Sequence, residues 1–283
     1  MEPTPLPSDD VALLALAGLS DPPAPDEGLF REGCWLRRVS AESVLLFGGG
    51  RALLLEVAHP LVAAGVAEHS KFRAEPFGRL QRTLEAMSAI TFQDHPAALA
   101  AARSVETAHD RVRGRLDRAA GPFAAGTSYS GRDPELMRWV WATLVDTALV
   151  VYQRFVAPLD DAGLAAYYAD QCVVARVLGI PAALVPPTWS EFHDYFEGVV
   201  ASDVLTVTPT AREIGEVVLN PPGGAVGGRR IRLITAGLLP ARLRDVFGLT
   251  WDAESAARLE ALTASVLALR AARPPLDGDR EAR

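Results

Sequence analysis

The sequence has little lysine and little cysteine, and each shortage narrows the possibilities. Lys71 is the only lysine among 28 basic residues, so arginine supplies nearly all of the positive charge. Together with the abundance of Ala, Leu, Val, Gly and Pro, this indicates GC-rich codon usage more than a function. Cys34 and Cys172 are the only cysteines, and neither lies in a CxxC or zinc-type spacing. One disulfide is possible, but two isolated free thiols are the simpler interpretation.

An excess of positive charge is also missing, as is a long apolar run. With 35 acidic residues the net charge is −7, which argues against a general nucleic-acid binder. The most apolar run, residues 139–152, is shorter than the roughly 20 residues of a membrane-spanning helix, and it contains Asp146. It predicts a buried core helix. The N-terminal residues, MEPTPLPSDD, lack the basic and apolar parts of a signal peptide, so we expect a cytoplasmic protein without a transmembrane segment.

Strand patterns are nearly absent, and residues 204–207 are the only candidates. The sequence therefore predicts an all-α protein of about ten helices in a single domain, which spans residues 30–272. An N-terminal extension with one short helix (1–29) precedes this domain, and a charged tail (273–283) follows it. The predicted core helices cover residues 41–47, 51–58, a segment from Pro60, 79–92, 95–116, 134–155, 160–178, 188–202, 209–218, 230–247 and 252–272. Residues 117–132 and 220–228 are predicted loops.

The glycines at 48–50 interrupt the helical pattern. They lack a Walker A lysine and do not fit GxGxxG after a strand, so they are not a nucleotide motif. We interpret them as a helix break that lets backbone pack closely. They would also let a large flat ligand approach the main chain.

Two histidines follow in the same stretch. His59 precedes Pro60, and His69 lies at the end of the next predicted helix. Each is either a ligand or a structural hydrogen-bonding group, and a lone histidine is more often structural. We therefore rank the structural role ahead of the catalytic one for both.

Arg79, Arg82 and Thr83 share one helix face, because they are spaced i, i+3 and i+4. Two guanidinium groups and a hydroxyl on one face can bind carboxylates, such as haem propionates, or donate hydrogen bonds to bound oxygen species. A solvated edge paired with Glu75 or Glu85 explains the spacing equally well.

His109 is the most informative histidine. Val105 and Val112 give one flank of its ring an apolar border, while Glu106 and Arg113 line the other flank. Such a histidine can bind iron through one ring nitrogen. Without further information, a core histidine paired with Glu106 is the better interpretation.

Other catalytic motifs are missing. The sequence has no HExxH and no GxSxG, and the Glu106/His109 pair is not repeated as the twin Glu-x-x-His of di-iron helices. These absences weigh against a zinc protease, a hydrolase and a di-iron protein.

Several segments resemble one known family in their order and spacing. They read LLFGGGRALLLEVAHPLVAAGVAEHSKFR, FGRLQRTLE, AHDRVRG, YSGRDPELMRWVWATLVDTALVVYQRF and TAGLLPARLRDVFGLTW. This order is similar to that of the mpaB / rubber oxygenase (latex clearing protein) catalytic domain family, over about residues 30–272. The resemblance implies an all-helical fold with a globin-like core, haem b held by a histidine, and dioxygen used to cleave carbon–carbon double bonds of isoprenoid chains.

The resemblance also implies roles for particular residues. His109 matches the histidine that binds the iron, Arg79 and Thr83 match an Arg…Thr pair near the haem, and Arg82 stands where rubber oxygenases carry a lysine. Trp141 is a departure, because many bacterial relatives have a histidine there, and tryptophan cannot ligate a metal.

The resulting hypothesis is a haem-b-dependent oxygenase that acts with dioxygen on a small hydrophobic, isoprenoid or alkene-like substrate. His109 is the metal ligand, Arg79, Arg82 and Thr83 are the catalytic polar groups, and His59, His69 and Trp141 are further candidates for cofactor contact. Two alternatives stay open, a non-catalytic protein that binds haem or a hydrophobic ligand, and a purely structural helical protein.

Overall fold

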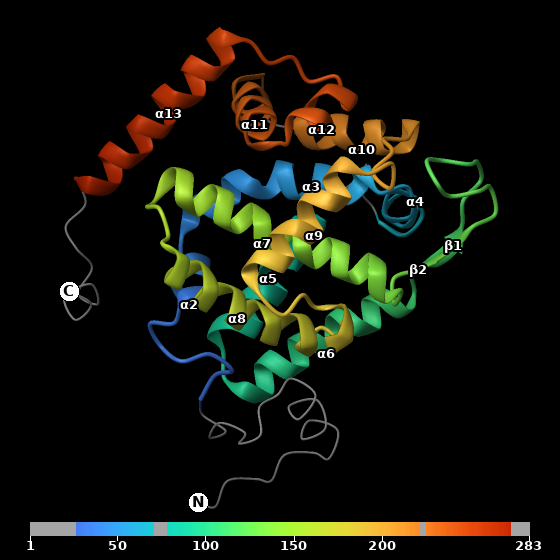
Figure 1. Ribbon diagram of the computed structural model, residues 1–283, viewed down its shortest axis with the longest axis horizontal. Coiled ribbons are helices and arrows are strands. Elements are labelled where there is room, and N and C mark those ends of the chain that lie inside the picture. The colour runs from blue at the N-terminus through green and yellow to red at the C-terminus, as the bar shows by residue number, and fades with distance from the viewer. Residues whose placement is uncertain (1–26, 71–77, 221–224, 273–283) are drawn as a thin grey trace, which may run out of the picture.

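The computed structural model describes residues 27–70, 78–220 and 225–272, and within them the all-α prediction is confirmed. Those residues form twelve α-helices, two short 3₁₀ helices and one two-stranded sheet (Figure 1). The short helix predicted in residues 1–29 and the tail predicted from residue 273 lie outside the described residues, except for residues 27–29. A globin-like arrangement of the core stays an expectation from the family resemblance.

The elements follow one another as long helices with short connections. The α-helices are α2 (Trp35–Ser40), α3 (Gly49–Ala58), α4 (Pro60–His69), α5 (Gly78–Phe92), α6 (His95–Asp110), α7 (Pro134–Phe155), α8 (Asp161–Val177), α9 (Trp189–Ala201), α10 (Pro209–Leu219), α11 (Ala225–Leu238), α12 (Ala241–Val246) and α13 (Ala253–Ala271). The 3₁₀ helices are η1 (Ser43–Gly48) and η2 (Ala182–Leu184), and the strands are β1 (Arg113–Arg115) and β2 (Ser128–Ser130).

Helix starts follow the capping rules that the sequence suggested. The side chains of Asp94, Asp133 and Thr188 accept hydrogen bonds from backbone N–H groups in the first turns of α6, α7 and α9. These caps satisfy N–H groups that have no partner within the helix. Proline in the first turn of α4 and α7 removes one such donor and fixes φ near the helical value.

Two buried helices, α3 and α7, form the centre of the molecule. The segment at 139–152 is the core helix that its composition predicted, since α7 buries residues on every side (Figure 1). The indole N–H of Trp139 donates to the carbonyl of Leu55 at 3.2 Å, which joins α7 to α3. Elements η1, α2, α8 and α13 pack around α7, while α4, α10 and α11 pack around α3.

The three glycines at 48–50 do not break the helix as predicted. Instead η1 passes into α3 at Gly49, and the glycines allow close packing, which was the second half of the interpretation. A Cβ on Gly48 would come within 2.5 Å of Thr147 Cγ2, and one on Gly50 within 2.1 Å of Thr235 Oγ1. The start of α3 therefore lies directly against α7 and α11.

A β-hairpin stands where the sequence predicted only helix and loop. Helix α6 ends at Asp110, earlier than expected, and β1 pairs antiparallel with β2, with Gly114 opposite Tyr129. The residues at 204–207, the only predicted strand candidates, are not in a strand. The predicted helix at 230–247 is likewise two helices, because Pro240 separates α11 from α12.

Within the described residues, no single helix has both the length and the apolarity to cross a bilayer. The segments Ser43–Ala58 and Pro60–His69 have the required length and apolarity only when they are taken together, and the chain bends by 109° between them. Cys34 and Cys172 are free thiols.

Candidate functional site

Helices α5 and α6 form an antiparallel pair that brings the predicted site residues to one end. Only residues 93 and 94 connect the two helices, which pack along their length. The beginning of α5 therefore lies beside the end of α6. Arg79, Arg82 and Thr83 belong to the beginning of α5, and His109 belongs to the last turn of α6. The four residues therefore lie at the same end of the helix pair, and the roles predicted for them stay predictions.

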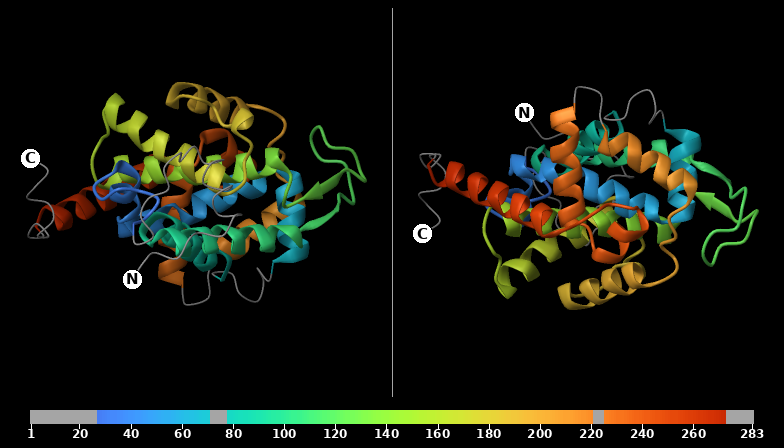
Figure 2. Two further views of the ribbon diagram at one scale, coloured as in Figure 1. Left: turned by 90° about the horizontal axis from the view of Figure 1, so that it is seen from below. Right: turned by 90° about the horizontal axis from the view of Figure 1, so that it is seen from above.

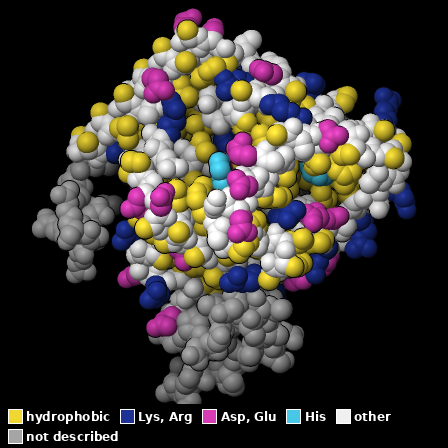
Figure 3. All heavy atoms as spheres, in the orientation of Figure 1, with side chains coloured by type: hydrophobic (Ala, Val, Ile, Leu, Met, Phe, Trp, Pro, Cys, Tyr) yellow, Lys and Arg dark blue, Asp and Glu magenta, His cyan; other side chains and the backbone are white. Residues whose placement is uncertain are grey.

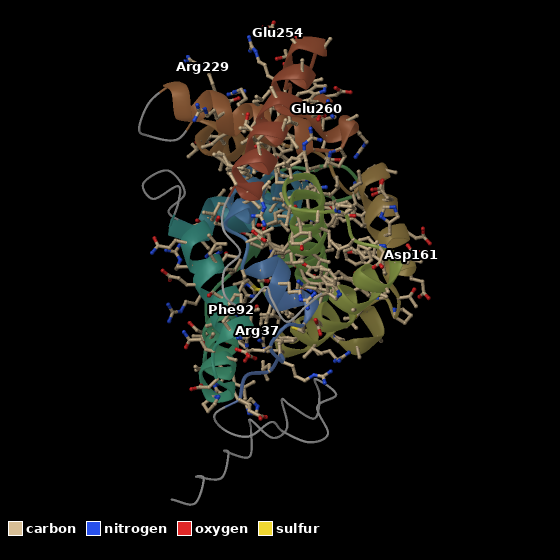
Figure 4. The ribbon with its side chains drawn as sticks, turned by 90° about the vertical axis from the view of Figure 1, so that its left-hand side faces the viewer. Arg37, Phe92, Asp161, Arg229, Glu254 and Glu260 are labelled. Carbon is tan, nitrogen blue, oxygen red and sulfur yellow. The ribbon has the colours of Figure 1, made fainter. Side chains whose placement is uncertain are left out.

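The two ends of this pair differ in burial. At the end near the connection, Ile90, His95 and Leu99 are almost completely buried. Arg37 of α2 also lies over the ring of Phe92 at 5.3 Å and fixes this end to the rest of the molecule (Figure 4).

The His109 end is more open. Arg82 is exposed, Thr83 and His109 are half-buried, and Leu84 is 40% exposed, which is high for a leucine in this protein. The side chain of Arg79 lies outside the described part of the structure. This end of the pair thus presents an imidazole, a cation and apolar surface in the same region.

The backbone around His109 is held in place by the neighbouring hairpin. The amide of Val112 donates to the carbonyl of His109 at 3.0 Å, and a Cβ on Gly131 would lie 2.7 Å from that same oxygen. Arg132 forms an ion pair with Glu106 at 2.5 Å and reaches Asp110 at 3.4 Å, and both carboxylates flank His109 on α6. These contacts fix the direction in which the imidazole leaves the helix.

His59 is a buried structural group at the start of α4. Its Nδ1 accepts a hydrogen bond from the amide of Leu61 at 3.3 Å, and its ring packs 5.0 Å from the ring of Phe123. Burial lowers the pKa of His59 to about 4, although the nearby carboxylate of Asp133 opposes this shift. The ring is therefore neutral at physiological pH and caps the helix.

His69 joins α4 to the hairpin. Its Nε2 lies 3.1 Å from the carbonyl oxygen and 3.3 Å from the amide nitrogen of Arg113, and its ring meets the ring of Tyr129 edge-on at 6.5 Å. These contacts agree with the structural role ranked first for His69. Cofactor contact by His59 or His69 stays a prediction.

Trp141 of α7 belongs to an aromatic cluster with residues of α8 and α9. The side chain is 2% exposed, and its ring lies 5.5 Å from that of Phe192 and 6.2 Å from that of Tyr168. Its indole nitrogen has no hydrogen-bond partner among the described atoms. The tryptophan thus fills space between α7, α8 and α9, and its predicted contact with a cofactor stays a prediction.

A buried ion pair joins three central helices and was missed in the sequence. The guanidinium of Arg51 on α3 donates to Asp146 Oδ2 at 2.5 Å and to Thr147 Oγ1 at 2.6 Å, both on α7, and to the carbonyl of Leu238 at 2.7 Å, the last residue of α11. Arg51 is 3% exposed and Asp146 is 6% exposed. Part of the signal was present, because Asp146 is the only charged residue in the apolar run at 139–152 and needs a partner of opposite sign when it is buried.

The residues at the His109 end can be compared with what haem would require of a protein. Among the described residues, no group of three or more His, Cys, Asp or Glu is placed to hold a metal ion. Haem carries four nitrogen ligands of its own and needs one axial side chain, which a single histidine can supply. Arginine is the residue best suited to its propionate carboxylates. A half-buried histidine, neighbouring arginine and exposed apolar surface are the parts that such a ligand would contact.

Comparison with known proteins gives one match, to a family. A family model described as "ER-bound oxygenase mpaB/B'/Rubber oxygenase, catalytic domain" matches residues 36–269, which is most of the chain. No curated protein and no solved structure matches. The matched residues run from α2 into the last turn of α13 and include both α5 and α6. The chain therefore belongs to the family of the mpaB/B′ and rubber oxygenase catalytic domain.

Proposed function

We propose that this protein is a haem-b-dependent oxygenase that uses dioxygen to oxidise a small hydrophobic substrate with an alkene or isoprenoid double bond. Membership of an oxygenase family supports the reaction class. The observation that supports haem as the cofactor is that His109, Arg82 and Thr83 lie at one open end of the α5–α6 pair. The proposed location is the cytoplasm.

Each residue at this end has a separate task in the proposal. The imidazole of His109 would hold the iron through one nitrogen, and the Gly131 and Arg132 contacts keep its backbone in position. Bound haem supplies the activation of dioxygen. Arg79 and Arg82 would pair with carboxylates of the cofactor, since a planar guanidinium binds a carboxylate through two hydrogen bonds.

Thr83 and the apolar residues complete the binding surface. The hydroxyl of Thr83 would donate a hydrogen bond to a polar group bound at this end of the helix pair. Leu84 and Val105 offer apolar surface on the two helices, and a hydrophobic substrate would exclude water from it. The substrate would therefore be recognised mainly by shape and apolarity.

The test is an absorption spectrum of protein produced with ample haem. We expect a Soret band that His109→Ala removes or shifts, while the matched change His193→Ala, at an exposed position of α9, leaves it unchanged. Absence of a Soret band in the unchanged protein, or a band insensitive to His109→Ala, would contradict the proposal. Oxygen uptake in the presence of an isoprenoid or other alkene then tests the reaction itself.

A second function is supported by Trp141. The family resemblance leads us to expect a histidine at this position, whereas here a buried indole packs on Tyr168 and Phe192. A protein changed in this way would bind haem or a hydrophobic ligand without turnover. Stoichiometric haem, together with no oxygen uptake for any alkene offered, would favour this alternative over the oxygenase.

A further inference from the structure

The segment from residue 111 to residue 132 carries a local excess of positive charge. It contains five arginines and one aspartate, with no lysine and no glutamate, in a chain whose net charge is −7. The segment includes β1, β2 and the loop between them, and we call it the basic hairpin. It projects from one end of the molecule in both views of Figure 2.

The arginines of the first half of the basic hairpin face solvent. Arg111, Arg113, Arg115 and Arg118 are all exposed. Alternation along β1 puts Arg113 and Arg115 on the same face of the strand, because Gly114 between them faces Tyr129 and Glu68. Figure 3 shows basic side chains at the edge of the molecule where the hairpin projects.

The contacts of these arginines leave their charge available. Arg113 donates to the carbonyl of Asp110 at 2.7 Å, and Arg115 donates to the carbonyl of Gly126 at 2.9 Å. A carbonyl group orients a guanidinium but does not neutralise its charge. Arg132 is different, because it is paired with Glu106 and Asp110.

The tip of the basic hairpin is apolar and uncharged. Residues 119–126 read AAGPFAAG, and Ala119, Pro122, Ala124 and Ala125 are exposed. Phe123 is half-buried and anchors the loop on His59.

Backbone contacts hold this tip in one shape. Ala120 and Phe123 form a bridge, and the amide of Gly126 donates to the carbonyl of Leu116 at 2.7 Å. Gly121, with φ of +55°, occupies the left-handed region that the tight turn requires. The loop therefore presents its apolar surface to solvent in an ordered conformation.

We propose that the basic hairpin docks the protein onto a membrane surface that contains anionic phospholipids. The exposed arginines would lie at the level of the lipid phosphates, and the apolar tip would enter the headgroup region. Basic residues beside a short apolar element are the combination that peripheral membrane binding requires. Nucleic acid fits less well, because the exposed part of the tip has no aromatic ring on which a base could stack.

Docking by this surface would also orient the candidate site. The basic hairpin begins two residues after His109, and Gly131 packs on the His109 backbone. The open end of the α5–α6 pair would therefore lie close to the bilayer, in which a water-insoluble substrate dissolves. This consequence rests on the proposed function, whereas membrane binding itself does not.

Vesicle flotation with the full chain tests the proposal. We expect binding to vesicles of three parts phosphatidylcholine to one part phosphatidylglycerol, little binding to phosphatidylcholine alone, and weaker binding as salt is added. The double change Arg111→Gln/Arg118→Gln removes two charges with no side-chain hydrogen bond or ion pair described for them. Each arginine near an anionic surface contributes about fivefold to affinity, so the double change should weaken binding roughly 10- to 30-fold.

Matched variants distinguish the effect of the basic hairpin on vesicle binding from the effect of the net charge. Arg229→Gln/Arg230→Gln removes two exposed arginines from α11 and should leave binding unchanged (Figure 4 labels Arg229). At the tip, Ala124→Asp/Ala125→Asp should abolish binding, whereas Ala124→Ser/Ala125→Ser should weaken it only slightly. Circular dichroism confirms that each variant folds.

Three results would overturn the proposal. They are equal binding to neutral and anionic vesicles, equal losses in the α11 and hairpin variants, and binding to a single- or double-stranded oligonucleotide without binding to vesicles. Because haem content is measured on the same protein, loss of vesicle binding with a normal Soret band is distinct from failure of the proposed function.

Discussion

At the scale of single residues, the Arg51–Asp146 pair carries the greatest consequence for folding. Its two charges are buried in the centre of the molecule, where each needs the other to offset the cost of losing water. Thr147 and the carbonyl of Leu238 accept hydrogen bonds from two further N–H groups of the guanidinium. The pair thus fixes how α3, α7 and α11 meet.

Replacing Asp146 by asparagine should lower the free energy of unfolding by about 3 to 5 kcal/mol, because it leaves the Arg51 charge buried without its counter-ion. Urea unfolding followed by circular dichroism measures this change. The matched control is Glu254→Gln, which removes an exposed partner of Arg258 and should change stability by less than about 1 kcal/mol. Equal effects of the two changes would mean that the buried pair contributes no more than a surface pair.

His59 makes stability depend on pH in a defined window. Its pKa is about 4 in the folded protein and 6.5 ordinarily, so the unfolded chain binds the proton more readily. The contribution of neutral His59 to the free energy of unfolding is fully present above pH 6.5. It is lost as the pH falls toward 4, and the total loss is about 3 kcal/mol. Protonation also removes the Nδ1 acceptor that caps α4.

Stability measured by urea unfolding between pH 7 and pH 4 checks this prediction. His59→Gln keeps an acceptor near Leu61 but does not titrate, so its stability should fall less steeply over that range. The matched change His193→Gln, at an exposed histidine, should follow the unchanged protein. If His59→Gln shows the same slope as the unchanged protein, another group governs the acid sensitivity.

At the scale of elements, the close contact of α3 with α11 depends on Gly50. Gly50→Ala should destabilise the protein by about 1 to 3 kcal/mol, because the new Cβ would lie 2.1 Å from Thr235 Oγ1 and Thr235 is 1% exposed. This cost exceeds the gain of up to about 1 kcal/mol in helix propensity.

The propensity gain can be seen alone at Gly198, inside α9. No atom lies within 4 Å of a Cβ built there, so Gly198→Ala should stabilise the protein slightly. Adding Thr235→Ala to Gly50→Ala removes the nearest clashing atom and should recover part of the loss. If Gly50→Ala lowers the thermal midpoint while Gly198→Ala raises it, the close packing at Gly50 is supported. Changes of the same sign in both variants would contradict it.

Most helices were predictable from sequence because their signals are local. Asp94, Asp133 and Thr188 cap helices as expected, and the apolar periods place α5 and α7 within a residue or two of their predicted bounds. The β1–β2 hairpin was not predictable in this way. Its strands read RGR and SYS, three residues each, so no alternating pattern develops, and they form because the chain pairs with itself beside α4.

The helices that hold the candidate residues were predictable in part, for the same physical reason. Spacing alone puts Arg79, Arg82 and Thr83 on one face, and the short connection between α5 and α6 places the beginning of α5 beside the last turn of α6, which contains His109. The contacts of His69 with Arg113 depend on the hairpin, which local pattern does not reveal. The Arg51–Asp146 pair depends on tertiary packing of helices far apart in the sequence, and the only local sign of it is the single charge of Asp146 in an apolar run.

At the scale of the whole molecule, the α5–α6 pair is firmly attached at one end and open at the other. Thr91, His95 and Leu99 near its connection are buried, whereas residues 103–110 are mostly exposed or half-buried. A cofactor that binds at the open end would bury this surface and would add its binding free energy to the stability of the folded protein. At a ligand concentration about one hundred times the dissociation constant, the gain is about 3 kcal/mol.

Hydrogen exchange with and without added haem tests this location. We expect exchange to slow at residues 81–88 and 103–112, because burial of the open end protects those amides, and to change little in α7, which is already buried. His109→Ala should abolish both the protection and the rise in thermal midpoint. Protection confined to α8 and α9 around Trp141 would instead place the cofactor in the aromatic cluster, and it would contradict the assignment of the iron ligand to His109.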